Sequence, residues 1–157
     1  ALAEYARAEF AAGSQELAIE RLQEAEQGSR KEAELLRKRL LDLEIPRLAA
    51  EAEQVGGWHL VCRVLEDYDG GNMRYMAQNL IRQPGMVVLL GIIEPSPQIC
   101  FARSQDIDLD MGQLLRTAAA PFGGRGGGAP HIAQGGGMAA EDVEEVLATA
   151  RREMLER

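Results

Sequence analysis

The stretch MVVLLGII at residues 86–93 decides the fold, because it is apolar almost without interruption. Pro84-Gly85 precedes it and Pro95 follows it, so turn-forming residues bound it on both sides. A short apolar run bounded in this way is typical of a central strand that is buried on both faces of a sheet. We therefore expect an α/β domain layered around this strand.

The segments on either side of this strand predict the rest of that domain. In chain order, the pattern of apolar residues predicts strands at 58–65 and 98–104 and helices at 72–82, 111–119 and 141–157. Asp110 stands directly before the second of these helices, where its carboxylate can cap the free backbone amides. The expected fold is a small mixed sheet with flanking helices, spanning residues 55–157.

The first third of the chain, residues 1–54, has a helical pattern instead. Leu22, Ser29, Leu36 and Leu43 recur every seven residues, with charged side chains between them. Gly28-Ser29 and Pro46 interrupt the pattern. Two alternatives stay open for these residues: a coiled-coil-like arm that dimerises the protein or presents the domain, or a helical hairpin that only spaces the domain.

Charge and glycine are distributed unevenly along the 157 residues. The chain carries 17 Lys and Arg against 25 Asp and Glu, a formal net charge of −8. Most of this acidity lies in residues 1–54 and 139–157, while residues 55–138 carry 6 basic and 7 acidic groups. An acidic chain argues against nucleic acid as a partner, but a nearly neutral middle segment weakens that objection.

The cysteines and the apolar segments indicate the cellular compartment of the protein, and the first residues indicate its place in a longer polypeptide. Cys62 and Cys100 both lie in apolar runs, which indicates two buried, reduced thiols in a cytoplasmic protein. The sequence contains no apolar stretch long enough to cross a membrane, and we expect neither a signal peptide nor a membrane partner. The chain begins at Ala1 without a methionine, so we expect it to be a piece of a longer polypeptide.

The segment FGGRGGGAPHIAQGGG at residues 122–137 is the richest in functional information. It holds 8 of the 17 glycines, and ordering so many glycines in a loop costs conformational entropy. Backbone amides of such a loop can form an anion-binding concavity, with Arg125 adding charge and His131 and Gln134 adding polar contacts. A flexible linker is the alternative, and the missing Lys-Ser/Thr excludes a P-loop.

This segment resembles the glycine-rich signature of the DHH-associated domain found at the C-terminus of alanyl-tRNA synthetases and of the free-standing AlaX-type editing proteins. Gly123–Gly128 and Ala133–Gly137 match the two glycine blocks of that signature. Arg125 stands where lysine is common, and His131 stands where an acidic residue is frequent. The resemblance extends over essentially the whole chain, including the helical lead-in.

The resemblance implies a non-catalytic domain that binds and positions alanine tRNA, next to upstream editing or catalytic domains of the same polypeptide. That polypeptide would be either an alanine–tRNA ligase or a deacylase that removes serine or glycine from alanine tRNA. The alternative is an oligomerisation module whose helical arm forms a homodimer and whose glycine loop is structural. The residues expected to contact RNA are Gly123, Gly124, Arg125, Gly126, Gly127, Gly128, His131, Gln134, Gly135, Gly136 and Gly137, supplemented by Arg103 and Arg116.

No catalytic or metal-binding residues are predicted. His59 and His131 are the only histidines, and they are too far apart in sequence to supply the paired His ligands of the zinc site expected in a separate editing domain. A third possibility, a DHH-type phosphohydrolase, lacks its Asp-His-His cluster. Asp106, Asp108 and Asp110 alternate, which fits a helix cap and its turn better than a metal site. We expect no cofactor in these residues.

Overall fold

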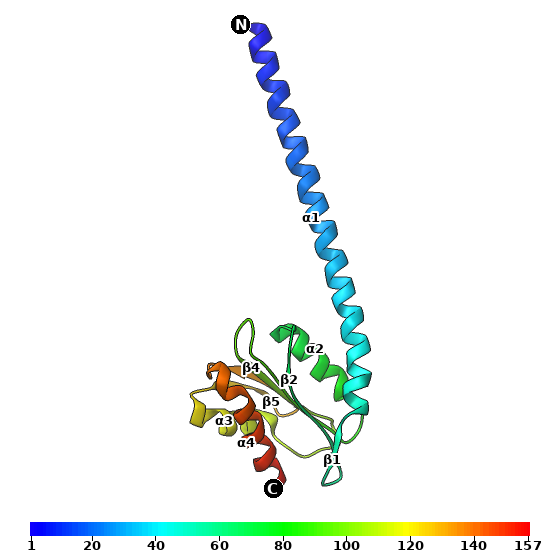
Figure 1. The fold of residues 1–157 in the computed structure, drawn as a ribbon, viewed down its shortest axis with the longest axis vertical. Coiled ribbons are helices and arrows are strands. Elements are labelled where there is room, and N and C mark those ends of the chain that lie inside the picture. The colour runs from blue at the N-terminus through cyan, green and yellow to red at the C-terminus, as the bar shows by residue number, and fades with distance from the viewer. The chain divides into compact units, whose positions relative to one another are not determined.

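A computed structural model describes all 157 residues and confirms the mixed α/β fold. Figure 1 shows the arrangement of its elements. The helices are α1 (Leu2–Ala50), α2 (Gly70–Leu80), α3 (Met111–Ala119) and α4 (Val143–Leu155). The strands are β1 (Glu53–Val55), β2 (Trp58–Leu65), β3 (Met86–Ile92), β4 (Gln98–Arg103), β5 (Arg125–Ala129) and β6 (Ile132–Gly136). Short 3-10 turns cover Ala120–Phe122 and Ala140–Asp142.

The chain divides into two compact units, residues 1–42 and 43–157, whereas the sequence predicted a division between residues 54 and 55. Helix α1 is continuous, so the helical-hairpin alternative for the first third of the chain is wrong. Residues around Gly28 are mostly good helix formers, which outweigh the cost of one glycine. Pro46 lies inside the last turns of the helix, where it removes only one backbone hydrogen bond.

The six strands of the second unit form one mixed sheet in the order β1-β2-β3-β4-β6-β5. β2 and β3 are parallel, and the other neighbouring pairs are antiparallel. All seven residues of β3 are buried, which confirms the central strand predicted from the apolar run. β5 is an edge strand, so one side of its backbone has no strand partner.

Side chains from opposite faces of the sheet pack against different helices. On one face, Leu89 and Phe101 join a core with α3 and α4 that includes Leu115 and Val146. On the other face lies α2, whose buried Met73, Met76, Ala77 and Leu80 form its inner side. The predicted helix at 72–82 is thus present, beginning two residues earlier, and the two helical layers are visible in Figure 1.

Capping residues set where the helices begin. The Asp69 carboxylate accepts a hydrogen bond from the Asn72 amide, and the Asn72 side chain in turn accepts from the Asp69 amide. Asp110 accepts from the Gln113 amide, which confirms it as the predicted N-cap of α3. No helix has both the length and the run of apolar residues needed to span a bilayer.

Both cysteines are free thiols, with Cys100 buried and Cys62 partly exposed. Burial raises the pKa of the Cys100 thiol to about 12, because the apolar interior disfavours the thiolate. The same desolvation raises the pKa of Cys62. Neither thiol is therefore activated as a nucleophile at neutral pH.

Candidate nucleic-acid interface

The glycine-rich segment is a β-hairpin, not the loop that the sequence predicted. β5 pairs with β6 along its whole length, from Arg125 opposite Gly136 to Ala129 opposite Ile132, around the turn Pro130-His131. The carbonyl of Pro130 accepts from the Met111 amide, and that of His131 accepts from the Arg103 amide. The hairpin tip is therefore held by both α3 and β4.

Close packing explains most of the glycines in this hairpin. A β-carbon at Gly126 or Gly135 would lie within 3 Å of Leu115 of α3 and would also collide with the opposite strand. A β-carbon at Gly124 would lie 2.7 Å from that of Ala119. Gly123 and Gly137 flank the hairpin with φ of +73° and +86°, which side chains disfavour. The fold thus requires these glycines for close packing and for turns with positive φ.

An anion-binding concavity of successive backbone amides is not formed, because strand pairing occupies half of the amides of β5 and those of β6. Only the alternate amides that point outward from the edge strand remain open to a ligand. Whether any of the predicted glycines contacts RNA stays a prediction. Backbone amides of the hairpin can therefore bind a ligand only along the open edge of β5.

Gln134 projects from β6 toward the start of α2. Its side-chain oxygen accepts a hydrogen bond of 3.0 Å from Arg74 Nη1, and its side-chain nitrogen donates to the Gly70 carbonyl at 3.2 Å. Arg74 was not among the predicted site residues, and no local pattern could reveal it, since 60 residues separate it from Gln134. The fold thus adds a guanidinium to the α2 side of the hairpin.

A second group of predicted residues lies where β4 ends. Arg103 is fixed by its own hydrogen bonds, from Nε to the Leu109 carbonyl at 2.7 Å and from Nη1 to the Ser104 carbonyl at 3.3 Å. Arg103 and His131 line the same groove, together with Arg82, which was not among the predicted site residues. Arg103 and His131, 28 residues apart in sequence, are thus brought together by the fold.

Arg116 and Arg125 lie on exposed positions of α3 and of the edge strand. The Nη1 atom of Arg116 lies 3.3 Å from the position that a β-carbon would take at Gly127, so its guanidinium lies against β5. Arg125 is the first residue of that strand and is solvent-exposed. Both predicted arginines therefore belong to the hairpin region, in addition to Arg74 beside β6.

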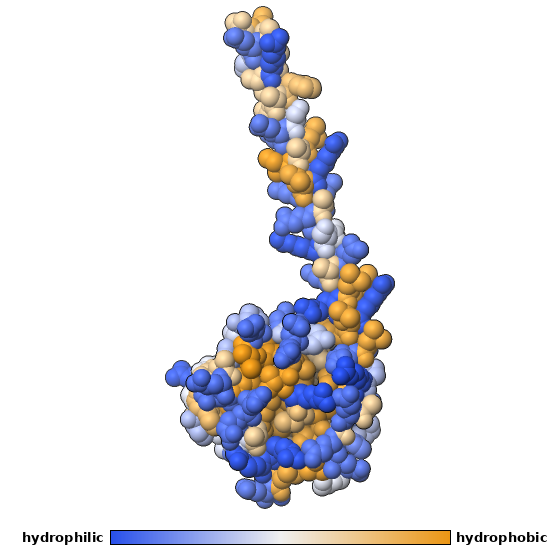
Figure 2. Space-filling view, in the orientation of Figure 1, coloured by the Kyte–Doolittle hydropathy of each residue, from blue (hydrophilic) through white to orange (hydrophobic).

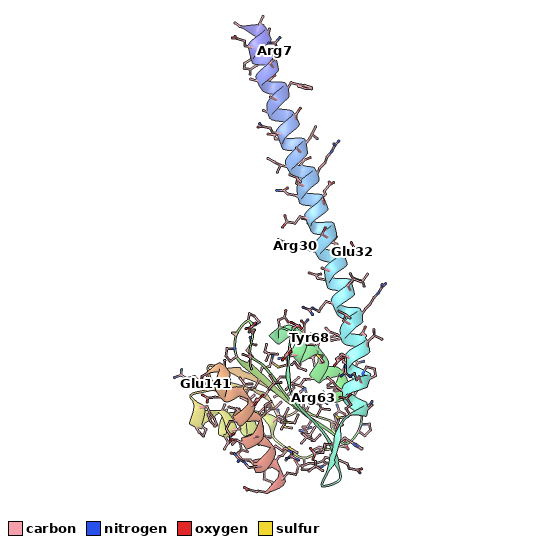
Figure 3. The ribbon with its side chains drawn as sticks, in the orientation of Figure 1. Arg7, Arg30, Glu32, Arg63, Tyr68 and Glu141 are labelled. Atoms are coloured by element: carbon pink, nitrogen blue, oxygen red, sulfur yellow. The ribbon has the colours of Figure 1, made fainter.

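The arginines around the hairpin differ from most others in the second unit by lacking carboxylate partners. Away from the hairpin, four arginines form ion pairs at 2.6–3.6 Å, namely Arg47, Arg63, Arg151 and Arg152. One of these, Arg63, is labelled beside the last turns of α1 and pairs with Glu51 (Figure 3). No carboxylate lies within 4.0 Å of the five hairpin arginines, Arg74, Arg82, Arg103, Arg116 and Arg125. The hairpin and the elements that flank it on both faces of the sheet therefore retain uncompensated positive charge on an acidic chain.

A protein-family model described as the DHHA1 domain matches residues 58–156, which is most of the chain. The chain belongs to the DHHA1 domain family. The matched residues contain the whole hairpin and all five hairpin arginines. The family match thus confirms the resemblance on which the sequence-based expectations rested.

Alanine–tRNA ligases are among the similar curated proteins. The enzyme of Acidothermus cellulolyticus is 36% identical over 140 residues, which cover 84% of this chain and 15% of the ligase. The enzyme of Synechocystis sp. is 31% identical over 148 residues, which cover 87% of this chain and 16% of the ligase. This DHHA1 chain therefore spans only about one sixth of the length of these relatives.

Solved structures with the same fold include the C-Ala domain of Aquifex aeolicus alanyl-tRNA synthetase. Its TM-score is 0.60 at 25% identity, and the match covers 68% of this chain and 99% of that domain. RecJ from Thermus thermophilus has a TM-score of 0.54 at 18% identity, covering 75% of this chain and 17% of RecJ. The RecJ likeness is one of fold alone.

Proposed function

We propose that this DHHA1 domain is a non-catalytic tRNA-binding domain of an alanine–tRNA ligase or of an alanyl-tRNA editing protein. The observation that carries the proposal is the group of five arginines around the hairpin, none of which is paired with a carboxylate. Guanidiniums without carboxylate partners attract phosphates, and their planar donors suit phosphate oxygens. The names of the relatives favour the ligase over the editing protein.

Binding by this domain alone should be weak, because the chain as a whole carries a net charge of −8. Upstream domains of the same polypeptide would then supply most of the affinity, and this domain would orient the tRNA relative to them. Simultaneous engagement of two linked sites raises the overall affinity without any new contact. The proposed role is positioning, and we assign it no catalytic residue, metal or cofactor.

Filter binding with alanine tRNA at several salt concentrations tests this function. We expect the affinity to fall as salt rises, and Arg125→Ala to weaken binding about twofold to tenfold. Arg152→Ala is the matched control, because Arg152 is also exposed but is paired with Glu145 at 3.1 Å. Equal losses of affinity in both variants would mean that only the overall charge of the chain matters. An unchanged affinity of Arg125→Ala would exclude Arg125 from the binding surface.

A second candidate function, oligomerisation through α1, is favoured by the apolar side chains that this helix exposes. Ten of the twelve large hydrophobic residues exposed in the chain lie on α1, where they are visible among hydrophilic neighbours in Figure 2. The seven-residue repeat places Leu22, Leu36 and Leu43 on one stripe, and they are 70%, 51% and 74% exposed. Pairing of two such stripes would bury this area.

Light scattering on the whole chain tests oligomerisation. If α1 dimerises, the chain has twice the monomer mass, and the double variant Leu22→Glu with Leu36→Glu becomes monomeric because it places charges in the seam. Leu17→Glu is the matched control, since Leu17 is 57% exposed but lies off the stripe. A monomeric parent chain at high concentration would exclude this function.

A further inference from the structure

A groove beside the hairpin tip is lined by amide and apolar side chains, which binding to phosphates alone would not require. It has a volume of about 510 Å³, within the range of sites for small molecules. It lies between the end of α2, the turn after β4, and the hairpin tip. Its lining residues that carry the argument are Gln78, Ile81, Arg82, Pro84, Gln105 and His131.

The polar groups in this groove are free to bind a ligand. Arg82 makes no ion pair and no side-chain hydrogen bond, so all of its guanidinium donors are available. The side-chain amides of Gln78 and Gln105 are also without protein partners. His131 is exposed at the lip of the groove. The groove thus offers a cation, two amides and an imidazole within one small volume.

One carboxylate, that of Asp106, also lines the groove, but it is already engaged. Its two oxygens accept hydrogen bonds from the Gly85 amide at 2.9 and 3.1 Å. Hydrogen bonds from the Ser104 side chain and from Gly85 lower the pKa of Asp106, so it is ionised at neutral pH. Its charge offsets one arginine, and with Arg82 and Arg103 present the groove keeps a net positive charge.

We propose that this groove binds one unstacked RNA nucleotide, an inference that rests on the proposed tRNA binding and identifies a subsite for it. Arg82 and His131 bind the phosphate, while Ile81 and Pro84 provide an apolar surface for the face of the base. Gln78 and Gln105 hydrogen-bond the edge of the base, since an amide offers both a donor and an acceptor. An acidic peptide would use Arg82 but leave the amides and the apolar surface without a role.

Titration of the isotope-labelled whole chain with small probes, followed by nuclear magnetic resonance, tests the groove. The probes are adenosine and uridine 5′-monophosphate, ribose 5-phosphate, inorganic phosphate and a glutamate-rich peptide. We expect a nucleotide to shift the side-chain amide signals of Gln78 and Gln105 and the imidazole signals of His131. The two phosphates without a base should need at least about tenfold higher concentrations for the same shifts, because they lack the base contacts.

Three variants test whether nucleotide binding depends on the arginine of the groove. Arg82→Ala should weaken nucleotide binding about tenfold, and Arg82→Lys should restore part of it because a point charge remains. Arg152→Ala should leave nucleotide binding unchanged, since Arg152 is paired with Glu145 and does not line the groove. The Arg82 side chain is exposed and unbonded, so an unchanged melting temperature verifies that its variants are folded.

Several results would contradict nucleotide binding in the groove. If phosphate or the acidic peptide shifts the Gln78 and Gln105 amide signals as strongly as a nucleotide does, the groove does not recognise a base. Nucleotide shifts confined to the region of Arg125 would move the site elsewhere. If the groove fails while Arg125→Ala still weakens tRNA binding, the proposed function stands without this subsite. If nucleotides bind the groove but tRNA does not bind the chain, the proposed function fails instead.

Discussion

Gly126 and Gly127 are neighbours in the same strand, yet a methyl group would meet very different surroundings at the two positions. At Gly126 it would collide with backbone atoms of Gln134 and Gly135 and lie 2.9 Å from Leu115. At Gly127 it would meet only the end of the Arg116 side chain, at 3.3 Å. Backbone cannot move aside without breaking the ladder, whereas a long exposed side chain can.

We therefore predict that Gly126→Ala destabilises the domain by about 1–3 kcal/mol, the usual cost of overpacking. Gly127→Ala, the matched control, should change stability by no more than about 0.5 kcal/mol. Urea unfolding of the two variants against the parent chain measures the difference. Equal stability of the two variants would mean that α3 does not hold the hairpin as closely as the structure has it.

At the scale of elements, the hairpin is an edge element with one protected and one exposed strand. β6 lies between β4 and β5, so its backbone groups are bonded on both sides. In β5 only alternate residues point their backbone N–H and C=O groups toward β6. The two-residue turn makes Ala129 and Ile132 a bonded pair, which directs the amides of Gly126 and Gly128 toward the open edge.

Hydrogen exchange followed residue by residue should therefore alternate along β5. We predict that the amides of Gly126 and Gly128 exchange at least about tenfold faster than those of Ala133 and Gly135, because the former have no partner strand. The measurement also separates this structure from the flexible linker that was the alternative interpretation of the sequence. Uniformly fast exchange over residues 125–136 would contradict the hairpin.

At the scale of the second unit, positive and negative charges lie at opposite ends of β3. The groove with Arg82 and Arg103 lies near the start of this strand. A second groove, lined by Glu66, Asp67, Glu94 and Glu144, lies near its end. Glu141, in the 3-10 turn that precedes α4, is labelled in Figure 3. Seven residues of strand separate the two ends by roughly 20 Å, so their interaction depends strongly on salt.

This separation predicts how the acidic end affects RNA binding. Replacing Glu94 and Glu144 together by Gln should raise the affinity for alanine tRNA about twofold to threefold at about 10 mM salt, where the Debye length is about 30 Å. At about 150 mM salt, where that length is about 8 Å, the same variant should bind like the parent chain. A gain of equal size at both salt concentrations would place RNA in contact with the acidic end.

The parts of the fold that the sequence predicted well are those with side-chain patterns. The strand at 58–65 has the predicted bounds, and α3 begins behind Asp110 as expected, because apolar spacing and helix caps are local signals. The hairpin was missed as an element because glycine has no side chain to reveal a period, and strands are normally poor in it. Arg74 and Arg82 were missed because only tertiary contacts bring α2 and the turn that follows it beside the hairpin.

The sequence by itself determined the buried central strand, the flanking helices, the family signature and the acidic balance of the chain. These follow from composition and short-range periodicity, which each segment carries alone. Only the tertiary structure decided that the glycines are needed for close packing under α3, and which arginines are left without carboxylates. Pairing of charges depends on which distant segments meet. Strand order and helix packing determine these contacts, and no local pattern of residues predicts them.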